Sequence, residues 1–233
     1  MTSTVLEEFS KSGYAVLRNI GTSATELSAL AMENGALCGG TFWGELQDVV
    51  YDPKAGGKES IASTREEMLL HTDGSFEPKP PRYLFLQCVA ADEPGFGESV
   101  VADIRRIIPK ISETARAALM TEGFEFSRTS NKKTVRVRAA ILGQDRRGFP
   151  SIRYRHDRVY KISAPSRAGE SAIAEIRELI HANDNAARIN MSEGDVLWID
   201  NHRVLHGRTP LSGTVIRRLR AAWADEKVPG ESA

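Results

Sequence analysis

The chain has few of the features that mark a secreted, membrane-bound or nucleic-acid-binding protein. It contains two cysteines, Cys38 and Cys88, in 233 residues. This is too few for a disulfide framework, so we expect a reduced, cytoplasmic setting. No apolar run approaches the roughly 20 residues that a membrane-spanning helix needs. The N-terminus also lacks the charged segment and apolar core of a signal peptide.

The charge is balanced, with 31 basic and 31 acidic residues. A neutral chain has no long-range field that would attract nucleic acid or a membrane surface, so we expect neither as a partner. The length suits one domain over residues 1–233. Residues 225–233 are expected to be a flexible tail, because they are charged and contain Pro229 and Gly230.

Short apolar and alternating segments predict a mainly β protein with flanking helices. A helix capped by Ser23 or Thr25 is expected to run through Glu33. Further helices are expected over 103–110, 112–121 and 170–182. Strands are expected over 14–17, 46–51, 82–90, 99–102, 124–127, 134–142, 149–154, 188–191, 195–200, 204–208 and 215–223. This order favours a double-stranded β-helix, or jelly roll, with helices packed outside.

The segment His71-Thr72-Asp73 places an imidazole and a carboxylate two residues apart. In extended chain, such side chains project from the same face. An oxygen-reactive ferrous site needs two histidines and one carboxylate on one face, with other positions left open. A turn with polar surface residues fits the same spacing, so these residues alone do not decide between the two interpretations.

Candidates for a second histidine occur in the segment 200–208, which contains His202 and His206. Four features, in this order, resemble the Fe(II)/2-oxoglutarate-dependent oxygenases of the taurine dioxygenase, γ-butyrobetaine hydroxylase and clavaminate synthase type. They are His-Thr-Asp at 71–73, Pro-Pro at 80–81 followed by an apolar strand and Gly-Glu-Ser at 97–99, Leu-His-Gly-Arg at 205–208, and Arg-x-Leu-x-x-x-Trp at 217–223. The resemblance implies His71, Asp73 and His206 as metal ligands. His202 is the competing ligand, and we interpret it as a structural residue or one at the rim of the site.

Arg217 is a candidate for binding the cosubstrate. In an extended segment it shares one face with Leu219, Ala221 and Trp223, three apolar residues, so this face is expected to point inward. A buried guanidinium needs an anionic partner, and its planar fork suits a carboxylate. The resemblance makes this partner the distal carboxylate of 2-oxoglutarate, with Ser99 as a second contact. An internal salt bridge is the alternative.

By the same resemblance, the protein would use Fe(II), 2-oxoglutarate and O2 to hydroxylate an unactivated C–H bond of a small polar substrate, such as an amino acid, and release succinate and CO2. Related halogenases have a small residue at the position of Asp73, so the aspartate argues against halogenation. Arg153 is a candidate for a substrate carboxylate, or else an outer-face charge. The taurine dioxygenase pattern has a second arginine where this chain has Ala221, so sulfonate binding of that kind is not expected.

Two other functional classes fit parts of this pattern. One is a jelly-roll binding or regulatory module that does not catalyse a reaction, which the complete ligand set with Arg217 and Ser99 argues against. The other is a zinc hydrolase with the same three ligands, which gives Arg217 no role.

Overall fold

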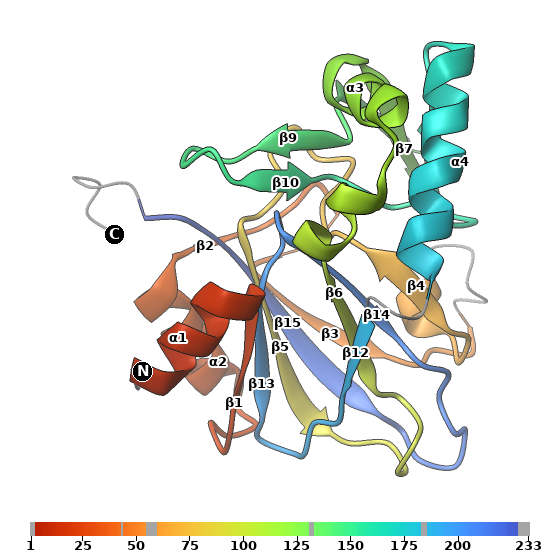
Figure 1. Ribbon diagram of the computed structural model, residues 1–233. Coiled ribbons are helices and arrows are strands. Elements are labelled where there is room, and N and C mark those ends of the chain that lie inside the picture. Colours follow the sequence, from red (N-terminus) through yellow and green to blue (C-terminus); the bar gives the residue numbers. More distant parts are fainter. Residues whose placement is uncertain (1–2, 43, 55–59, 131–132, 183–185, 228–233) are drawn as a thin grey trace.

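The computed structural model describes residues 3–42, 44–54, 60–130, 133–182 and 186–227. Two β-sheets form its centre (Figure 1). The larger sheet has the order β1-β13-β5-β15-β2, with β3 also paired to β15, and the smaller has the order β12-β6-β14-β4. The six strands of the larger sheet are β1 (Tyr14–Leu17), β2 (Ala36–Cys38), β3 (Leu46–Val50), β5 (Tyr83–Ala90), β13 (Val196–Asp200) and β15 (Arg218–Asp225). The smaller sheet consists of β4 (Met68–His71), β6 (Ser99–Asp103), β12 (Ala186–Ile189) and β14 (Val204–Arg208).

The inner faces of the two sheets share one apolar cluster. Leu86, Leu197 and Leu219 of the larger sheet pack in it with Val101 and Val204 of the smaller one. β5 is buried along most of its length, as its nearly continuous apolar sequence predicts. This arrangement confirms the predicted jelly roll.

Helices cover the outer faces of both sheets (Figure 1). On the larger sheet, α2 (Ala24–Asn34) buries Leu27, Leu30 and Ala31 against β5, β13 and β15. Ser23 caps α2 in a capping box with Glu26, which settles the choice between Ser23 and Thr25. The same side carries α1 (Ser3–Ser12), whose Phe9 stacks on Trp198 at a centroid distance of 3.6 Å.

The outer face of the smaller sheet packs against a second group of elements. Leu70 and Leu205 of that sheet join Leu119 of α3 (Glu113–Thr121) and Ile176 of α4 (Arg167–His181) in one apolar cluster. A three-stranded sheet belongs to this region and has the order β11 (Tyr160–Ser163), β7 (Phe124–Ser130), β8 (Lys133–Ala139). A hairpin of β9 (Leu142–Gln144) and β10 (Pro150–Ile152) lies beside α3 (Figure 1).

Some predicted boundaries were wrong. The helix expected over 103–110 is two 3-10 turns, η2 (Ile104–Arg106) and η3 (Ile108–Lys110), because Pro109 cannot continue a regular hydrogen-bonded helix. A further 3-10 turn, η1 (Ile61–Ser63), precedes β4. Strands β2 and β11 were not predicted. Residues 228–233 of the expected tail lie outside the described residues, and β15 includes Asp225.

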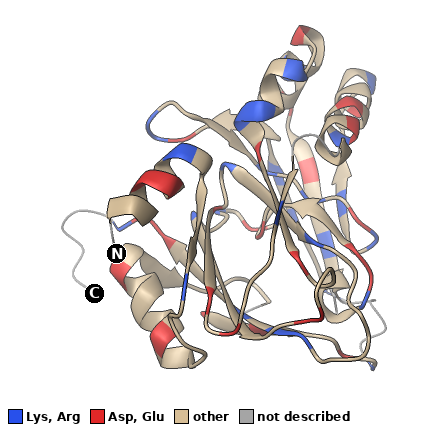
Figure 2. Cartoon of the chain, turned by 60° about the horizontal axis from the view of Figure 1, so that its bottom comes forward, with Lys and Arg blue, Asp and Glu red and all other residues tan. Residues whose placement is uncertain are grey.

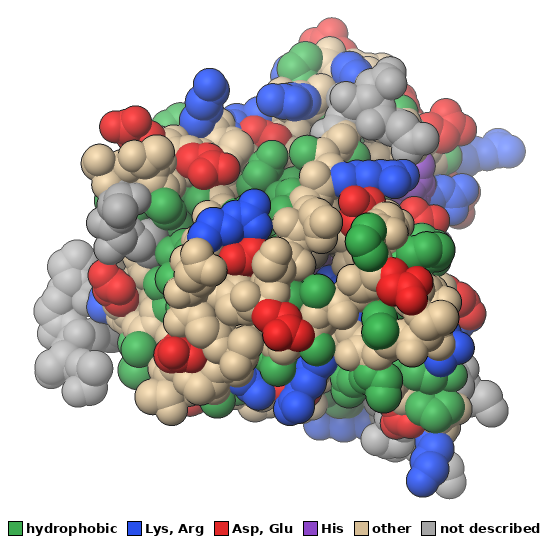
Figure 3. Space-filling view, turned by 90° about the horizontal axis from the view of Figure 1, so that it is seen from below, with side chains coloured by type: hydrophobic (Ala, Val, Ile, Leu, Met, Phe, Trp, Pro, Cys, Tyr) green, Lys and Arg blue, Asp and Glu red, His purple; other side chains and the backbone are tan. Residues whose placement is uncertain are grey.

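Acidic and basic residues are interspersed along the chain (Figure 2). The face seen in Figure 3 likewise carries both signs of charge, with apolar side chains between them. In the described part of the chain, no helix is both long and apolar enough to span a bilayer.

Candidate metal centre

Two neighbouring strands bring the two histidines together. β14 lies between β6 and β4, and in its ladder with β4 His206 pairs directly with His71. Their rings lie with centroids 4.3 Å apart. The β4–β14 ladder is irregular immediately after this pair, at Gly207. A Cβ at Gly207 would lie 2.4 Å from the carbonyl oxygen of Met68, so this close approach of the strands requires glycine.

Asp73 follows β4 in a tight turn instead of continuing the strand. Gly74 has φ of +66°, a conformation that favours glycine. Asn201 holds the turn from the end of β13: its Oδ1 accepts a hydrogen bond from Asp73 N at 2.8 Å, and its Nδ2 donates to Asp73 O and Pro81 O at 3.0 and 2.9 Å. Asp73 is therefore in a turn and not in an extended strand, but its carboxylate is directed toward the histidines as expected.

Ligand atoms of His71, Asp73 and His206 all lie within 4.8 Å of one another. Asp73 Oδ1 is 3.4 Å from His71 Nε2 and 3.7 Å from His206 Nε2. Two donors that are each about 2.1 Å from one ion can be up to about 4.2 Å apart, so both separations suit a shared metal. His71 Nδ1 is 2.8 Å from the carbonyl oxygen of Leu69. A proton on Nδ1 satisfies this contact and leaves the Nε2 lone pair for a metal.

The protonation states of the candidate ligands also favour binding of a cation. Burial of Asp73 opposes its ionisation, but the close contacts of its carboxylate with His71, His206 and Arg155 outweigh it, so the pKa of Asp73 is lowered. Burial, reinforced by His71, lowers the pKa of His206 to about 3. The site therefore offers an ionised carboxylate and a neutral imidazole, the forms that bind a metal.

The surroundings of the other polar atoms of Asp73 and His206 are also compatible with a metal site. The indole Nε1 of Trp223 donates to Asp73 Oδ2 at 3.1 Å, which leaves Oδ1 facing the histidines. His206 Nδ1 is buried with no hydrogen-bond partner among the described residues. Two imidazoles and one carboxylate on one side, with room on the other, form the donor set of non-heme iron oxygenases.

A cavity opens beside these three side chains. Arg217 and Ser99, the predicted cosubstrate contacts, both line it and are only 5% and 3% exposed. Arg155 and Arg208 line it as well. The other lining residues, besides the three candidate ligands, are Val49, Ala62, Met68, Leu86, Gly207, Leu219 and Ala221.

Arg217 lies on the inward face, immediately before β15. Leu219, Ala221 and Trp223 are buried with it. Within the described residues, its guanidinium makes no hydrogen bond or salt bridge, so the structure provides no internal ion pair of the kind considered as the alternative. Burial and the charge of Arg208 lower the pKa of Arg217 to about 10, although the charge of Asp92 acts in the opposite direction.

Arg218 and Arg220 lie on the opposite face. Both pair with Asp48 of β3, and the Arg220 Nε–Asp48 Oδ1 distance is 3.2 Å. The alternation that assigned Arg217 to the interior therefore also placed its two basic neighbours correctly.

Arg153 and His202 lie elsewhere. The guanidinium of Arg153 donates to the carbonyl oxygens of Glu77 and Pro78 at 2.9 and 3.3 Å, and Arg153 does not line the cavity. Its predicted contact with substrate therefore finds no support in this geometry. His202 Nε2 is 3.1 Å from the carbonyl oxygen of Pro80, away from the three candidate ligands.

Sequence reasoning missed two contributors to the site. Arg155 lies two residues after Arg153, so the same alternation that was applied to Arg217 marks it as a second candidate. Its guanidinium Nη1 is 3.5 Å from Asp73 Oδ1. Asn201 was quoted only as part of a longer segment, and no sequence signal showed that it pairs with the Asp73 turn.

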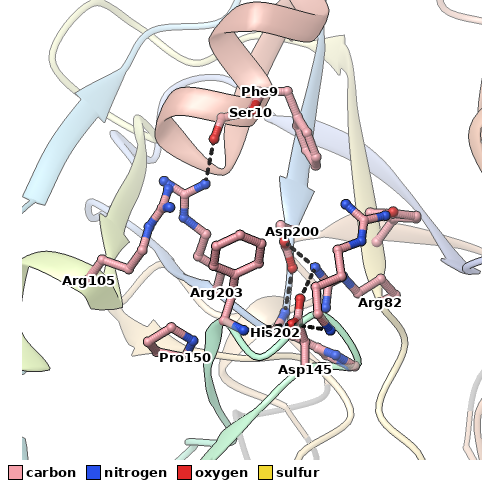
Figure 4. A pocket seen from close by; sticks show the side chains of 12 residues that line it. Phe9, Ser10, Arg82, Arg105, Asp145, Pro150, Asp200, His202 and Arg203 are labelled. Carbon is pink, nitrogen blue, oxygen red and sulfur yellow. Dashed lines mark hydrogen bonds and ion pairs between the residues drawn. The ribbon is translucent and has the colours of Figure 1, made fainter.

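A second cavity, of about 250 Å3, lies between α1 and the β9–β10 hairpin (Figure 4). Its arginines are already paired. Arg82 contacts Asp200 at 2.8 Å and Asp145 at 3.1 Å, and Arg203 contacts Asp103 at 2.6 Å. These ion pairs connect the end of β13 to the neighbouring elements, and the cavity contains none of the candidate metal ligands.

Comparison with known proteins identifies relatives that match most of the chain. It is 28% identical over 211 residues to 3-((Z)-2-isocyanoethenyl)-1H-indole synthase of Fischerella ambigua, a match that covers 84% of this chain and 75% of the relative. It is 28% identical over 189 residues to L-asparagine oxygenase of Streptomyces coelicolor, covering 77% and 50%. The chain thus spans about half the length of the latter.

Solved structures show the same fold. A crystal structure of asparagine oxygenase with Fe(II), 2S,3S-3-hydroxyasparagine and succinate matches with a TM-score of 0.71 at 21% identity, covering 95% of this chain and 78% of that one. The family model described as taurine catabolism dioxygenase TauD, TfdA family matches residues 3–223. The chain therefore belongs to the TauD/TfdA family.

Proposed function

We propose that the protein is an Fe(II)- and 2-oxoglutarate-dependent dioxygenase that hydroxylates an unactivated C–H bond of a small polar substrate, such as an amino acid. The observation that carries this proposal is the convergence of His71, Asp73 and His206 beside a cavity that also contains the buried guanidinium of Arg217. Neither a metal site alone nor a buried arginine alone would require 2-oxoglutarate.

The three ligands would hold Fe(II) through His71 Nε2, Asp73 Oδ1 and a ring nitrogen of His206. When iron and 2-oxoglutarate are bound, such a centre couples decarboxylation of the cosubstrate to succinate and CO2 with oxidation of a C–H bond by O2. The protein fixes the ligands before the metal arrives: Trp223 orients the Asp73 carboxylate, and Leu69 orients the His71 ring. Pre-oriented ligands lose little conformational freedom on metal binding.

Arg217 and Ser99 would bind the distal carboxylate of 2-oxoglutarate. Arg217 is 5% exposed and forms no salt bridge with a described residue, and a buried unpaired cation costs several kcal/mol. A bidentate carboxylate removes this cost and is selected by the planar fork. Arg208 is less available for this role, because it donates to the carbonyl oxygens of Ala62, Thr64 and Glu66 at 3.2, 2.8 and 2.6 Å.

The apolar lining of the cavity would keep bulk water from the reacting atoms. Leu86 and Leu219 come from the larger sheet, and Met68 comes from the strand that carries His71. Water exclusion strengthens the electrostatic contacts within the site and limits side reactions.

The names of two relatives support an amino-acid substrate. L-asparagine oxygenase matches over 77% of this chain, and L-lysine 3-hydroxylase of Catenulispora acidiphila matches over 70% at 22% identity. The chain covers only 50% and 46% of these proteins, so the extension to its own substrate belongs to the proposal.

Anaerobic addition of Fe(II) and 2-oxoglutarate tests the proposal. A weak visible charge-transfer band is expected for the wild type, and it should be lost in His71→Ala. A subsequent screen of amino acids for substrate-dependent release of succinate should identify the substrate. If there is no band, or if the band is unchanged in His71→Ala, the proposal is wrong, and a binding module or a zinc enzyme becomes the better account.

A further inference from the structure

Three arginines line the candidate active-site cavity, and two of them already have a partner or an assigned role. Arg208 is held by backbone carbonyl groups, and Arg217 is assigned to the cosubstrate under the proposed function. The remaining one, Arg155, lies between β10 and β11 with its side chain 3% exposed. The cavity therefore contains one buried guanidinium that the cosubstrate does not use.

The guanidinium of Arg155 is held at Nε, but its Nη2 donors have no hydrogen-bond partner among the described residues. Its Nε donates to Asp157 Oδ2 at 3.3 Å, and its plane lies over the Tyr160 ring, with Cζ 3.7 Å from the ring centroid. Nη2 is buried. Nη1 makes no hydrogen bond with a described residue, and it lies 3.5 Å from Asp73 Oδ1.

When a metal ion is bound, the contact with Asp73 cannot satisfy the hydrogen-bond donors of Arg155. Asp73 Oδ1 is the carboxylate oxygen nearest both histidines, so a bound cation would draw on the same oxygen. Asp157 would then be the remaining acidic contact of Arg155, at Nε, and the two terminal nitrogens would have no hydrogen-bond partner among the described residues. An unsatisfied buried donor of a charged group is costly, and a carboxylate meets both donors at once.

We propose that Arg155 binds a carboxylate of the primary substrate and so selects for substrates that carry one. This inference rests on the proposed function. It also concerns the position of oxidation: an anion held on Arg155 lies beside Asp73, so the carbon atoms within a few bonds of the carboxylate are the ones nearest to the metal ligands. Because Asp73 is itself negative, binding of the anion requires the divalent cation.

Acetate is a probe for this site that does not depend on knowing the substrate. The protein is loaded with Mn(II) under saturating 2-oxoglutarate, which occupies Arg217, and 13C-labelled acetate is titrated in. The paramagnetic broadening of its carboxylate resonance reports binding close to the metal. The variant is Arg155→Gln, and the matched control is Arg158→Gln, which removes an exposed arginine that pairs with Glu66.

We expect saturable broadening in the wild type and in Arg158→Gln, and an affinity for acetate that is about tenfold or more weaker in Arg155→Gln, because a charge-assisted pair is lost. Equal affinity in the wild type and Arg155→Gln would overturn the inference, and so would the absence of saturable broadening in the wild type. If Arg155→Gln does not fold, Arg155→Lys decides. It keeps the charge but loses the fork, so unchanged affinity in this variant would also overturn the inference.

Binding measurements with Mn(II) and 2-oxoglutarate distinguish a failure of this inference from a failure of the proposed function. Binding of Mn(II) and of 2-oxoglutarate is measured first by calorimetry in the wild type and in both variants, so that acetate affinities are compared at saturating metal and cosubstrate for each protein. If the wild type binds neither, the proposed function fails. If it binds both and Arg155→Gln takes up acetate like the wild type, only the assignment of Arg155 fails.

Discussion

The indole Nε1 of Trp223 donates a hydrogen bond to Oδ2 of Asp73 at 3.1 Å. The two side chains come from opposite sheets, Trp223 from β15 and Asp73 from the turn after β4. The bond leaves Oδ1 as the atom directed at both histidines. Closure of the jelly roll and orientation of the candidate carboxylate ligand are thus connected through one contact.

Trp223→Phe should weaken metal binding. It removes the donor to Asp73 and keeps most of the aromatic volume, and loss of such a supporting contact typically lowers metal affinity by about 10- to 100-fold. Trp198→Phe is the matched control, because Trp198 is also buried but its Nε1 has no hydrogen-bond partner among the residues described. Mn(II) titration followed by EPR measures both variants, and equal affinities in the two would contradict the role given to Trp223.

Asn201→Ala should both destabilise the fold and weaken metal binding. Its side chain makes three hydrogen bonds to the backbone of Asp73 and Pro81, all buried. Leaving these backbone groups unsatisfied is expected to cost about 2–4 kcal/mol of unfolding free energy. Urea denaturation of the metal-free protein measures this change. A loss below about 0.5 kcal/mol, with unchanged Mn(II) affinity, would show that the turn holds Asp73 without Asn201.

Arg217→Gln should raise the 2-oxoglutarate requirement while leaving metal binding intact. Loss of a buried, charge-assisted contact of about 2 kcal/mol corresponds to roughly a 30-fold weaker affinity. The neighbouring Arg218→Gln is the control, since Arg218 pairs with Asp48 on the outer face. Calorimetric titration of 2-oxoglutarate into the Mn(II)-loaded proteins distinguishes the two. Equal affinities in the two variants would remove Arg217 from the site.

The ion-pair cluster of Figure 4 predicts a pH effect on stability. Burial raises the pKa of Asp200 to about 6, although the charge of Arg82 acts in the opposite direction. The unfolded value is about 3.9. A carboxyl whose pKa is raised on folding holds its proton more tightly in the folded state. Its stabilising contribution is therefore complete below about pH 4 and is lost as the pH rises through about 6.

The side chain of Asp200→Asn cannot ionise. The difference in unfolding free energy between this variant and the wild type should therefore shift by about 2–3 kcal/mol in favour of the variant as the pH rises from 4 to 7. Asp195→Asn is the control, because this substitution should lower the free energy of unfolding at neutral pH. Burial of Asp195 is outweighed by the hydrogen bonds from Ser192 N and Arg18, so its pKa is lowered and it stabilises the fold at neutral pH. Urea denaturation across this range measures both variants. A pH-independent difference between the wild type and Asp200→Asn would refute the raised pKa.

The elements predicted best from the sequence are those whose burial follows a simple period. β5 is nearly continuously apolar and buried along most of its length, and α2 has both a capping residue and an apolar stripe. The alternation along 217–223 predicted the inward position of Arg217 correctly, because one residue parity is enough to divide a strand into two faces. β2 and β11 were missed because each is short and its pairing depends on a partner far along the chain.

The candidate ligands were identified by motif, but their geometry depends on tertiary contacts. Direct pairing of His206 with His71 requires the register of β14 on β4, which no local pattern encodes. The roles of Asn201 and Trp223 likewise arise only when β13 and β15 come close to the Asp73 turn. For the same reason Arg153 and Arg155, which have equal parity in the sequence, differ in the fold: one binds backbone carbonyls and the other lines the cavity.

An iron-edge anomalous difference map from crystals grown anaerobically with Fe(II) and 2-oxoglutarate tests the central claim most directly. We predict one iron peak at about 2.1 Å from Asp73 Oδ1 and His71 Nε2 and within bonding distance of His206, with a carboxylate of the cosubstrate against Arg217. An iron peak elsewhere in the chain, or a cosubstrate that does not contact Arg217, would contradict the account.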